Sequence, residues 1–178
     1  MKKLLSPLNI ILLCAVCFIV SFYYARKNFE QNFSSDLFES EYNRYAALSE
    51  GINKIVHLPL VQGTLMSPDA LFSVVSYDIS EKPVGLYLPL PASPWAITIY
   101  DETCNSFYSL DERNFNADYL QVILHRKEQA APENEDVLNI TAPGKKGIIV
   151  TRLIIPDISK QPLLSELRKE MRTGIINK

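Results

Sequence analysis

Four polar residues around one predicted hairpin are the best candidates for chemistry in this 178-residue sequence. Asp101 and Asp111 follow two short β-rich runs, Tyr108 lies inside the second run, and Arg113 comes just after it. Two carboxylates, a phenol and a guanidinium that face one pocket would bind a polar ligand. The same residues also suit a structural role, in which each aspartate accepts hydrogen bonds from turn amides and Arg113 pairs with one of them. We expect the structural role, and a ligand site formed by all four residues is the alternative.

The sequence lacks the familiar motifs of metal sites and enzymes. Its two histidines, His57 and His125, have no second histidine, cysteine or carboxylate at the spacing of a metal site. It contains no Gly-x-Ser-x-Gly motif and no glycine-rich phosphate loop, and its one Cys-x-x-Cys pair lies in an apolar run near the N-terminus. We therefore predict no metal ion or other cofactor. Whether the protein is an enzyme stays open, because a site without a known motif would leave no such signal.

The charge balance argues against a nucleic-acid-binding protein. Lys and Arg number 18 against 20 Asp and Glu, which gives a formal net charge of −2. A surface that neutralises phosphates needs a local surplus of Lys and Arg, and no stretch of this sequence supplies one. We therefore expect no nucleic acid among the partners.

The residues from Leu8 to Ala25 form an apolar run that predicts one membrane crossing. Sixteen of these eighteen residues are apolar and none is charged. As a helix they would span roughly 27 Å, close to the roughly 30 Å hydrocarbon core of a bilayer. A cleaved signal peptide is the alternative, but the bulky residues Phe22, Tyr23 and Tyr24 stand where a peptidase needs small ones. We expect the run to be retained as a signal anchor.

This anchor predicts the organisation of the whole chain. Residues 1–7 would be a short cytoplasmic tail, residues 8–25 the transmembrane helix, residues 26–57 a stalk helix or linker, and residues 58–178 a β-rich extracytoplasmic domain. The basic residues on the two sides of the run nearly balance, so the orientation depends on the short tail preceding a large folded body. We expect a single-pass protein of the bacterial inner membrane, with its N-terminus in the cytoplasm and its body in the periplasm.

The stalk shows helical periodicity. Its apolar side chains recur at steps of mostly three and four: Phe29, Phe33, Leu37, Phe38, Tyr42, Tyr45, Leu48, Ile52 and Ile55. The helix is either continuous with the apolar run or broken near Ser34 and Ser35. We expect its apolar stripe to pack on the protein's own domain, with a dimeric coiled coil as the alternative. The oligomeric state stays open.

Short β-rich runs separated by turn residues follow. In Trp95–Tyr100 the bulky apolar residues alternate with smaller or more polar ones, as in a strand with one buried face. The seven predicted strands are Leu71–Ile79, Val84–Leu88, Trp95–Tyr100, Ser106–Leu110, Tyr119–Leu124, Val137–Thr141 and Ile148–Ile155. Their spacing is typical of a sandwich or barrel. Pro162–Arg172 predicts a closing helix, bracketed by Pro162 and Gly174. We therefore expect a mainly β, antiparallel sandwich-like domain with a transmembrane helix, a stalk helix and a C-terminal helix.

Four segments of the sequence carry distinctive motifs. They are an Asp-x-Leu-Phe-Ser start at Asp69, a Tyr-Asp-Ile-Ser turn at Tyr77, a Trp-x-Ile-x-Ile-Tyr-Asp strand at Trp95 and the Phe-Tyr-Ser-Leu-Asp-Glu-Arg hairpin that ends at Arg113. These motifs resemble the bacterial family catalogued as domain of unknown function 1254, and its short membrane-anchored branch in particular. A closing strand at Gly147–Pro156 is also similar. The resemblance implies an antiparallel β-sandwich in the cell envelope and implies no reaction. Ser67 and Ala70 depart from the Asn and Thr that long members carry there.

The resemblance also implies a partner. Long members of that family carry a second β-rich domain after this one, and this chain ends where it would begin. We therefore expect a non-enzymatic binding or assembly module that pairs with a separately encoded β-rich protein. The alternative is a ligand-binding or hydrolytic domain that acts on an envelope component.

Overall fold

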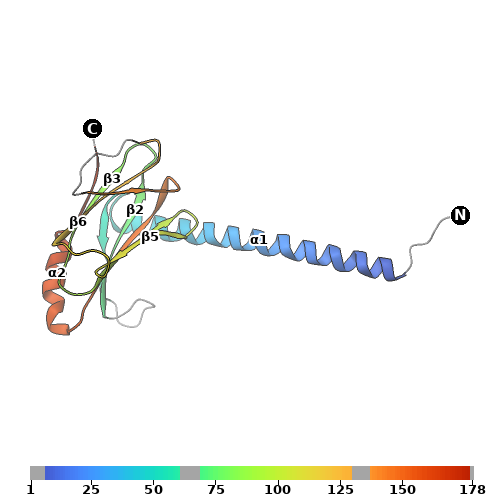
Figure 1. Cartoon of the computed structure of the whole chain (residues 1–178), viewed down its shortest axis with the longest axis horizontal. Helices are drawn as coiled ribbons and strands as arrows, with labels where there is room; N and C mark the ends of the chain where they lie inside the picture. The colour runs from blue at the N-terminus through green and yellow to red at the C-terminus, as the bar shows by residue number, and fades with distance from the viewer. Residues whose placement is uncertain (1–6, 61–68, 130–136, 177–178) are drawn as a thin grey trace.

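A long helix leads into a β-sandwich in the computed structural model of the chain (Figure 1). The structure describes residues 7–60, 69–129 and 137–176, except for the side chains of helical residues 7–15 and 29–34. The elements, in chain order, are α1 (Pro7–Leu48), β1 (Ile55–His57), β2 (Ala70–Asp78), β3 (Val84–Pro89), β4 (Trp95–Asp101), β5 (Ser106–Asp111), β6 (Tyr119–His125), β7 (Leu138–Thr141), β8 (Lys146–Ile154), the 3-10 turn η1 (Ile158–Lys160), α2 (Gln161–Lys169) and β9 (Arg172–Ile175).

The strands form two packed sheets. One has the order β1-β2-β8-β4-β5 and the other β7-β6-β3-β9. The first sheet pairs its strands antiparallel throughout, and the β6–β7 pair of the second sheet is parallel. This arrangement confirms a mainly β fold with two packed sheets.

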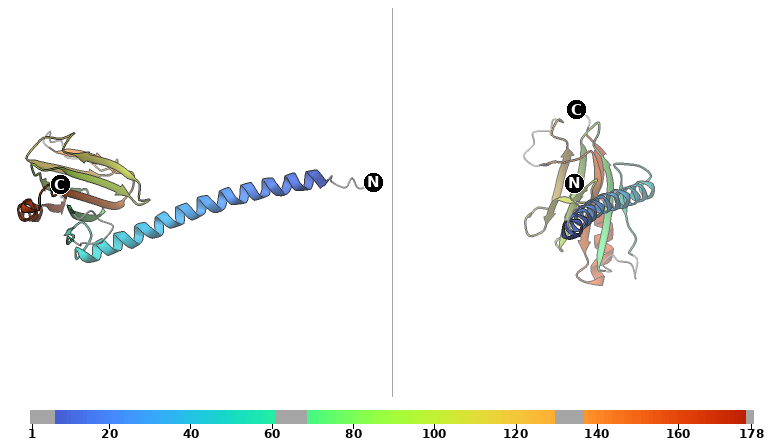
Figure 2. Two further views of the ribbon diagram at one scale, coloured as in Figure 1. Left: turned by 90° about the horizontal axis from the view of Figure 1, so that it is seen from below. Right: turned by 90° about the vertical axis from the view of Figure 1, so that its right-hand side faces the viewer.

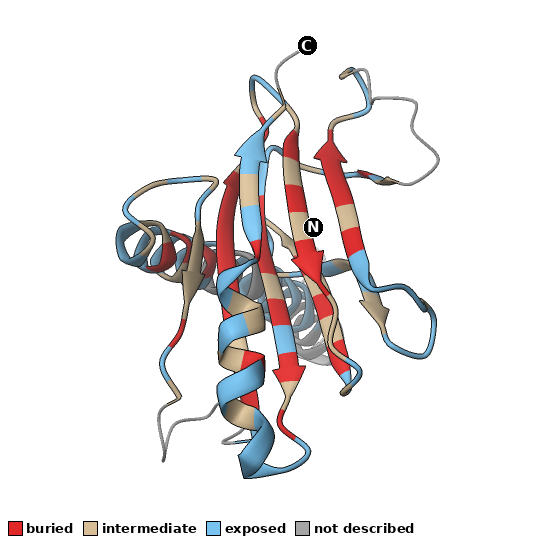
Figure 3. Ribbon diagram, turned by 90° about the vertical axis from the view of Figure 1, so that its left-hand side faces the viewer, coloured by how far each residue is buried: buried red, intermediate tan, exposed pale blue. Residues whose placement is uncertain are grey.

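Alternating side chains build the core between the sheets. In β4, Trp95, Ile97 and Ile99 are buried while the residues between them are partly exposed. Buried residues of β3 and β6 belong to the same core, and red and paler bands alternate along strands of the sandwich in Figure 3. In β3 and β4 the period of two that predicted the strands is largely the period of burial, whereas the last four residues of β6 are all buried.

The last third of α1 packs on the outer face of the first sheet. Phe38, Tyr42 and Tyr45 form a second apolar cluster with Val74 and Ile148. Ser76 Oγ donates a 2.8 Å hydrogen bond to the Tyr42 carbonyl oxygen, in the backbone of the helix. Burial, aided by the Asp78 carboxylate, raises the pKa of the Tyr42 phenol to about 12. These contacts confirm that this part of the predicted stripe packs on the protein's own domain, and α1 is continuous through Ser34 and Ser35.

The N-terminal part of α1 extends far from the sandwich (Figure 2). Its large apolar side chains from Val16 to Tyr24 are 48% to 72% exposed. Among the described residues, no helix combines the length and the hydropathy that a membrane crossing requires.

Two strands were not predicted. β1 has only three residues, too few to show a period of two, and its pairing with β2 decides its conformation. β9 begins at Arg172, which the sequence placed in the closing helix, because α2 already ends at Lys169. Gly174, expected to terminate that helix, instead lies opposite Gly85 in the β3–β9 pair.

Among the described glycines, Gly147 has the least room for a side chain. A Cβ atom there would collide with the Tyr100 carbonyl oxygen and with the ring and hydroxyl of Tyr77. The Tyr77 hydroxyl donates a 3.2 Å hydrogen bond to that same carbonyl. Gly174, in contrast, has nothing within 4 Å of the place where a Cβ would lie.

We expect Gly147→Ala to lower the free energy of unfolding by about 2 kcal/mol or more, because the buried Tyr77 cannot move away without disturbing the core. Gly174→Ala is the matched control and should change it by less than about 0.5 kcal/mol. Denaturant unfolding of the two variants measures both values. Equal effects would show that the approach at Gly147 is not tight.

Candidate functional site

The hairpin of β4 and β5 carries the four residues singled out in the sequence, and it spreads them along its length. Asp101 lies at the turn that joins the strands, whereas Asp111 pairs with Ala96 at the opposite end. Five residue steps along β4, from Ala96 to Asp101, separate those positions, which is roughly 17 Å. Tyr108 lies between them, opposite Ile99. The structure therefore does not bring the four side chains into one pocket.

Asp101 shapes the turn between the strands. Its Oδ1 accepts hydrogen bonds from the Thr103 amide at 2.9 Å, the Thr103 hydroxyl at 2.6 Å and the Asn105 amide at 3.1 Å. These bonds hold Cys104 at a φ of 61°, in the left-handed region that non-glycine residues rarely adopt. This is the structural role expected for Asp101.

Asp111 and Arg113 shape the turn after β5. Asp111 Oδ1 accepts from the Arg113 amide at 3.1 Å and from Asn114 Nδ2 at 2.9 Å. The side chain of Arg113 is 84% exposed, and its Nε lies 4.0 Å from the Glu112 carboxylate. Arg113 thus meets an aspartate through its backbone amide, whereas its guanidinium pairs with Glu112.

Tyr108 belongs to the edge of the core. Its ring is half-buried and packs against the main apolar cluster. Burial raises the pKa of its phenol, so the group stays neutral near pH 7.

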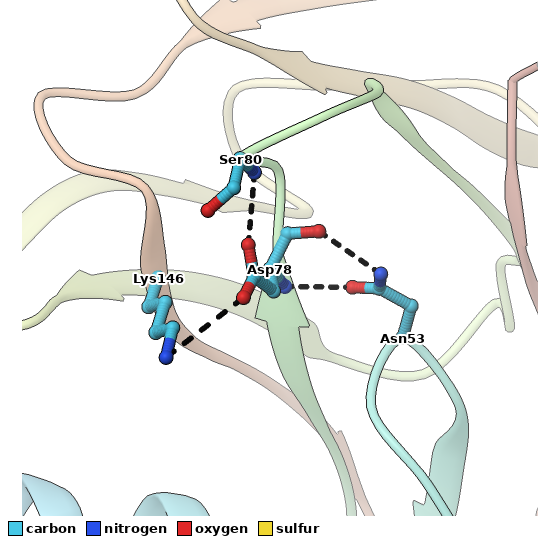
Figure 4. Close-up of polar contacts among 4 residues, drawn as sticks. All are labelled: Asn53, Asp78, Ser80 and Lys146. Atoms are coloured by element: carbon cyan, nitrogen blue, oxygen red, sulfur yellow. Dashed lines mark hydrogen bonds and ion pairs between the residues drawn. The ribbon is translucent and has the colours of Figure 1, made fainter.

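Asn53 is the centre of a polar cluster that the sequence analysis missed (Figure 4). Its side-chain oxygen accepts from the Asp78 amide at 2.7 Å, and its Nδ2 donates to the Asp78 carbonyl at 3.0 Å. The Asp78 carboxylate accepts from the Ser80 amide at 2.8 Å and lies 3.9 Å from Lys146 Nζ. Asn53 has a φ of 62°, a conformation that asparagine tolerates better than most residues. An asparagine two residues after Gly51 was therefore the signal in the sequence for a turn at this position.

This cluster connects three elements rather than presenting reactive groups. The side-chain amide of Asn53 pairs with the backbone of Asp78, at the end of β2, as a neighbouring strand would. Lys146 reaches the Asp78 carboxylate from β8. An adjoining cavity of about 220 Å³ is lined by Asn53, Asp78, Ser80, Glu81, Lys82 and Ile175. The cluster therefore holds the segment between α1 and β1 against the sheet.

His57 and Ser73 form the one contact in the described residues that resembles a base and its nucleophile. His57 Nδ1 lies 2.9 Å from Ser73 Oγ. Burial, together with the positive charge of Arg168, lowers the pKa of His57, which therefore stays neutral at pH 7. The nearby Arg168 Nη1 donates to the Leu58 carbonyl at 2.9 Å and the Phe72 carbonyl at 3.2 Å.

The surroundings of this pair favour a structural role. Ser73 is only 1% exposed, so its hydroxyl cannot reach a substrate without a rearrangement of the sheet. Arg168 connects α2 to the carbonyl of Leu58, just after β1, and to the carbonyl of Phe72, in β2. We assign the pair to the packing between α2 and the first sheet.

We expect Asn53→Ala to lower the free energy of unfolding by about 2 kcal/mol. The change removes both bonds to Asp78 and leaves a residue that disfavours a positive φ. Asn105→Ala is the matched control, because the Asn105 side chain bonds only to the exposed Thr103 hydroxyl in the contacts described, and it should cost less than about 0.5 kcal/mol. Denaturant unfolding followed by circular dichroism measures both, and similar losses would contradict the role assigned to Asn53.

Comparison with known proteins identifies the fold and the family. The VPA0106 protein of Vibrio parahaemolyticus is similar in structure with a TM-score of 0.67 and 11% identity, over 83% of this chain and 36% of its own. A putative uncharacterized protein from Burkholderia cenocepacia has a TM-score of 0.54 and 13% identity, over 76% of this chain and 38% of its own. At such identity these likenesses show the fold alone, and this chain spans little more than a third of either protein. No curated protein matches the sequence significantly. The family model described as "Protein of unknown function (DUF1254)" matches residues 52–174, which is well over half of the sequence, and the chain therefore belongs to the DUF1254 family.

Proposed function

We propose that this protein is a non-catalytic binding module of the bacterial cell envelope, held at the inner membrane by the N-terminal part of α1. The observation that carries the proposal is the exposure of consecutive large apolar side chains on α1 between Val16 and Tyr24. Water is a poor solvent for such a surface, so another apolar phase must cover it.

The arrangement of these side chains favours lipid over a protein partner. Successive residues of a helix point about 100° apart, so Phe18, Ile19 and Val20 lie on different sides of α1, while Phe22 stacks on Phe18 one turn further along. A partner helix covers one face, whereas lipid covers every face. In the sequence the apolar run continues back to Leu8 without a charge. These features support a single crossing by residues 8–25.

The rest of α1 would hold the sandwich away from the bilayer. Between Ala25 and Phe38 the helix rises roughly 20 Å before it reaches the sheet. In the proposed orientation the N-terminus lies in the cytoplasm and the sandwich in the periplasm. A body held at such a distance suits a module that binds partners in the periplasm.

The use of the polar side chains supports a binding role over a catalytic one. Asp101 and Asp111 accept hydrogen bonds from turn amides, and Ser73 is buried beside His57. Each of these groups stabilises a turn or the packing between α2 and the first sheet.

We expect the full chain to remain in the membrane fraction after alkaline carbonate extraction. The double variant Val16→Asp with Phe18→Asp should be extracted, because each charge near the centre of a crossing helix costs about 3 kcal/mol. Fractionation followed by immunoblotting measures the distribution. A C-terminal alkaline phosphatase fusion, active only in the periplasm, tests the orientation.

The matched control is the double variant Leu37→Asp with Leu48→Asp. These leucines are also exposed on α1, at 45% and 54%, but lie beyond the apolar run. This variant should fractionate like the original chain. Extraction of the original chain by carbonate would overturn the membrane anchor, as would equal behaviour of the two double variants.

We also propose a separately encoded β-rich partner for the sandwich. Both solved structures extend well beyond the part that resembles this chain, so the fold has neighbouring structure in those proteins. In this chain the outer face of the second sheet carries an open groove of about 320 Å³ over Gly85 and Gly174, bordered by Tyr87, Ile123 and Ile175. It offers an apolar surface where a partner can pack.

We expect one β-rich protein to co-purify in stoichiometric amount with the full chain from mildly solubilised membranes. Ile175→Lys, at a half-exposed position in the groove, should abolish its recovery, whereas Ile158→Lys, which is 73% exposed and lies outside the groove, should not. Mass spectrometry identifies and quantifies the chains. Recovery that is unchanged by Ile175→Lys would exclude this groove as the contact.

A further inference from the structure

A second cavity lies at the end of the sandwich, between the β3–β4 loop and α2. Its volume is about 350 Å³, and its lining is almost entirely apolar. The loop contributes Leu90, Pro91, Ala92 and Ser93, and the other wall contains Pro156, Lys160, Leu163, Leu164 and Leu167. Leu164 is buried, whereas Leu163 is 65% exposed. The cavity is therefore open to solvent on the side of Leu163.

This lining contains one buried hydroxyl without a hydrogen-bond partner among the described residues and one charged side chain. The Ser93 hydroxyl is shielded from solvent and has no hydrogen-bond partner among the described residues. Buried hydroxyls normally have one, so its position suits a ligand atom or a water molecule. Lys160 is exposed, in the turn that precedes α2.

The negative charge nearest to Lys160 in sequence is Asp157, which is already engaged. Its carboxylate accepts a 2.8 Å hydrogen bond from the Ser159 amide as the cap of η1. That bond, followed by a weaker effect of Lys160, lowers the pKa of Asp157. The Lys160 ammonium thus keeps donors for a second anion at the rim of the cavity.

We propose that this cavity binds an aliphatic chain that ends in an anion, with the chain between the leucines and the anionic end at Lys160. At roughly 30 Å³ for each non-hydrogen atom, the cavity holds about a dozen such atoms, the size of a medium-length fatty acid. A longer chain can extend through the open side, across Leu163. The shared chemistry fits a free fatty acid and a single-chain phospholipid.

The site is separate from the proposed membrane anchor. It is built from the β3–β4 loop and α2, whereas α1 packs on the first sheet around Val74 and Ile148. The inference therefore goes beyond the proposed function and does not rest on it.

The only tryptophan of the chain, Trp95, follows Ser93 by two residues and provides the readout. We expect 11-bromoundecanoic acid to quench its fluorescence in a saturable manner, because bromine quenches only at short range. Excess undecanoic acid should restore the emission. The full chain is titrated in phospholipid nanodiscs, or in buffer if it does not enter them, so that failure of the anchor and failure of this site are distinguished.

The variants test the two parts of the site. Leu163→Glu should weaken the affinity by about ten-fold or more, since it places a charge against the bound chain. Ile158→Glu, at a comparably exposed residue that does not line the cavity, should leave the affinity unchanged. Lys160→Gln should weaken binding of the acid several-fold and leave binding of 11-bromoundecanol unchanged. Circular dichroism establishes that each variant is folded.

A brominated lysophosphatidylglycerol distinguishes the two sources of the chain: tighter binding of the lysophospholipid indicates a membrane lipid, and tighter binding of the fatty acid indicates a free acid. Either result supports the site. Quenching that does not saturate would overturn the proposal, as would equal affinity in Leu163→Glu. If the acid and the alcohol bind the original chain equally, the anionic specificity is wrong.

Discussion

The pairing of β2 with β8 is the constraint on which the rest of the structure depends. Nine residues of each strand pair in one unbroken antiparallel register, from Ala70 opposite Ile154 to Asp78 opposite Lys146. One face of this pair faces the second sheet, and the other faces α1 through Val74 and Ile148. Because side chains alternate along a strand, a shift by one residue would exchange these two faces. The register therefore decides both where the core lies and where α1 attaches.

Polar contacts at both ends of the β2–β8 pair attach the neighbouring segments to it. At the Asp78 end, Asn53 fixes the segment after α1, and Lys146 reaches Asp78 from the paired strand. Toward the other end, Arg168 connects α2 to the Leu58 and Phe72 carbonyls. Buried donors are normally hydrogen-bonded, so these few contacts help to determine how α1 and α2 approach the first sheet. They also explain why polar residues that look reactive in the sequence are occupied in the fold.

The attachment of α1 and the proposed binding surfaces lie on different parts of the sandwich. α1 is fixed to one face of the first sheet by Phe38, Tyr42 and Tyr45, while its N-terminal part extends away from the sandwich (Figure 2). The two surfaces proposed above for other molecules are the outer face of the second sheet and the end of the sandwich beside α2. Both are apolar and lie away from the α1 attachment. The proposed surfaces and the attachment of α1 therefore use different parts of the sandwich.

Elements with a clear period could be predicted from the sequence. The alternation of Trp95, Ile97 and Ile99 indicated a strand with one buried face, and the steps from Phe38 to Tyr45 indicated a helix with an apolar stripe. Asp101 and Asp111 accept hydrogen bonds from turn amides, as the sequence predicts, because such bonds are local.

Features that depend on contacts between distant residues became visible only in the folded molecule. β1 and β9 are too short to have a period of their own and form because β2 and β3 offer them hydrogen-bonding partners. The pairing of Asn53 with Asp78, the tight space at Gly147 and the cavity between Ser93 and Leu163 each join segments far apart in the chain. Local patterns carry no information about which distant segments meet, so these features needed the folded molecule.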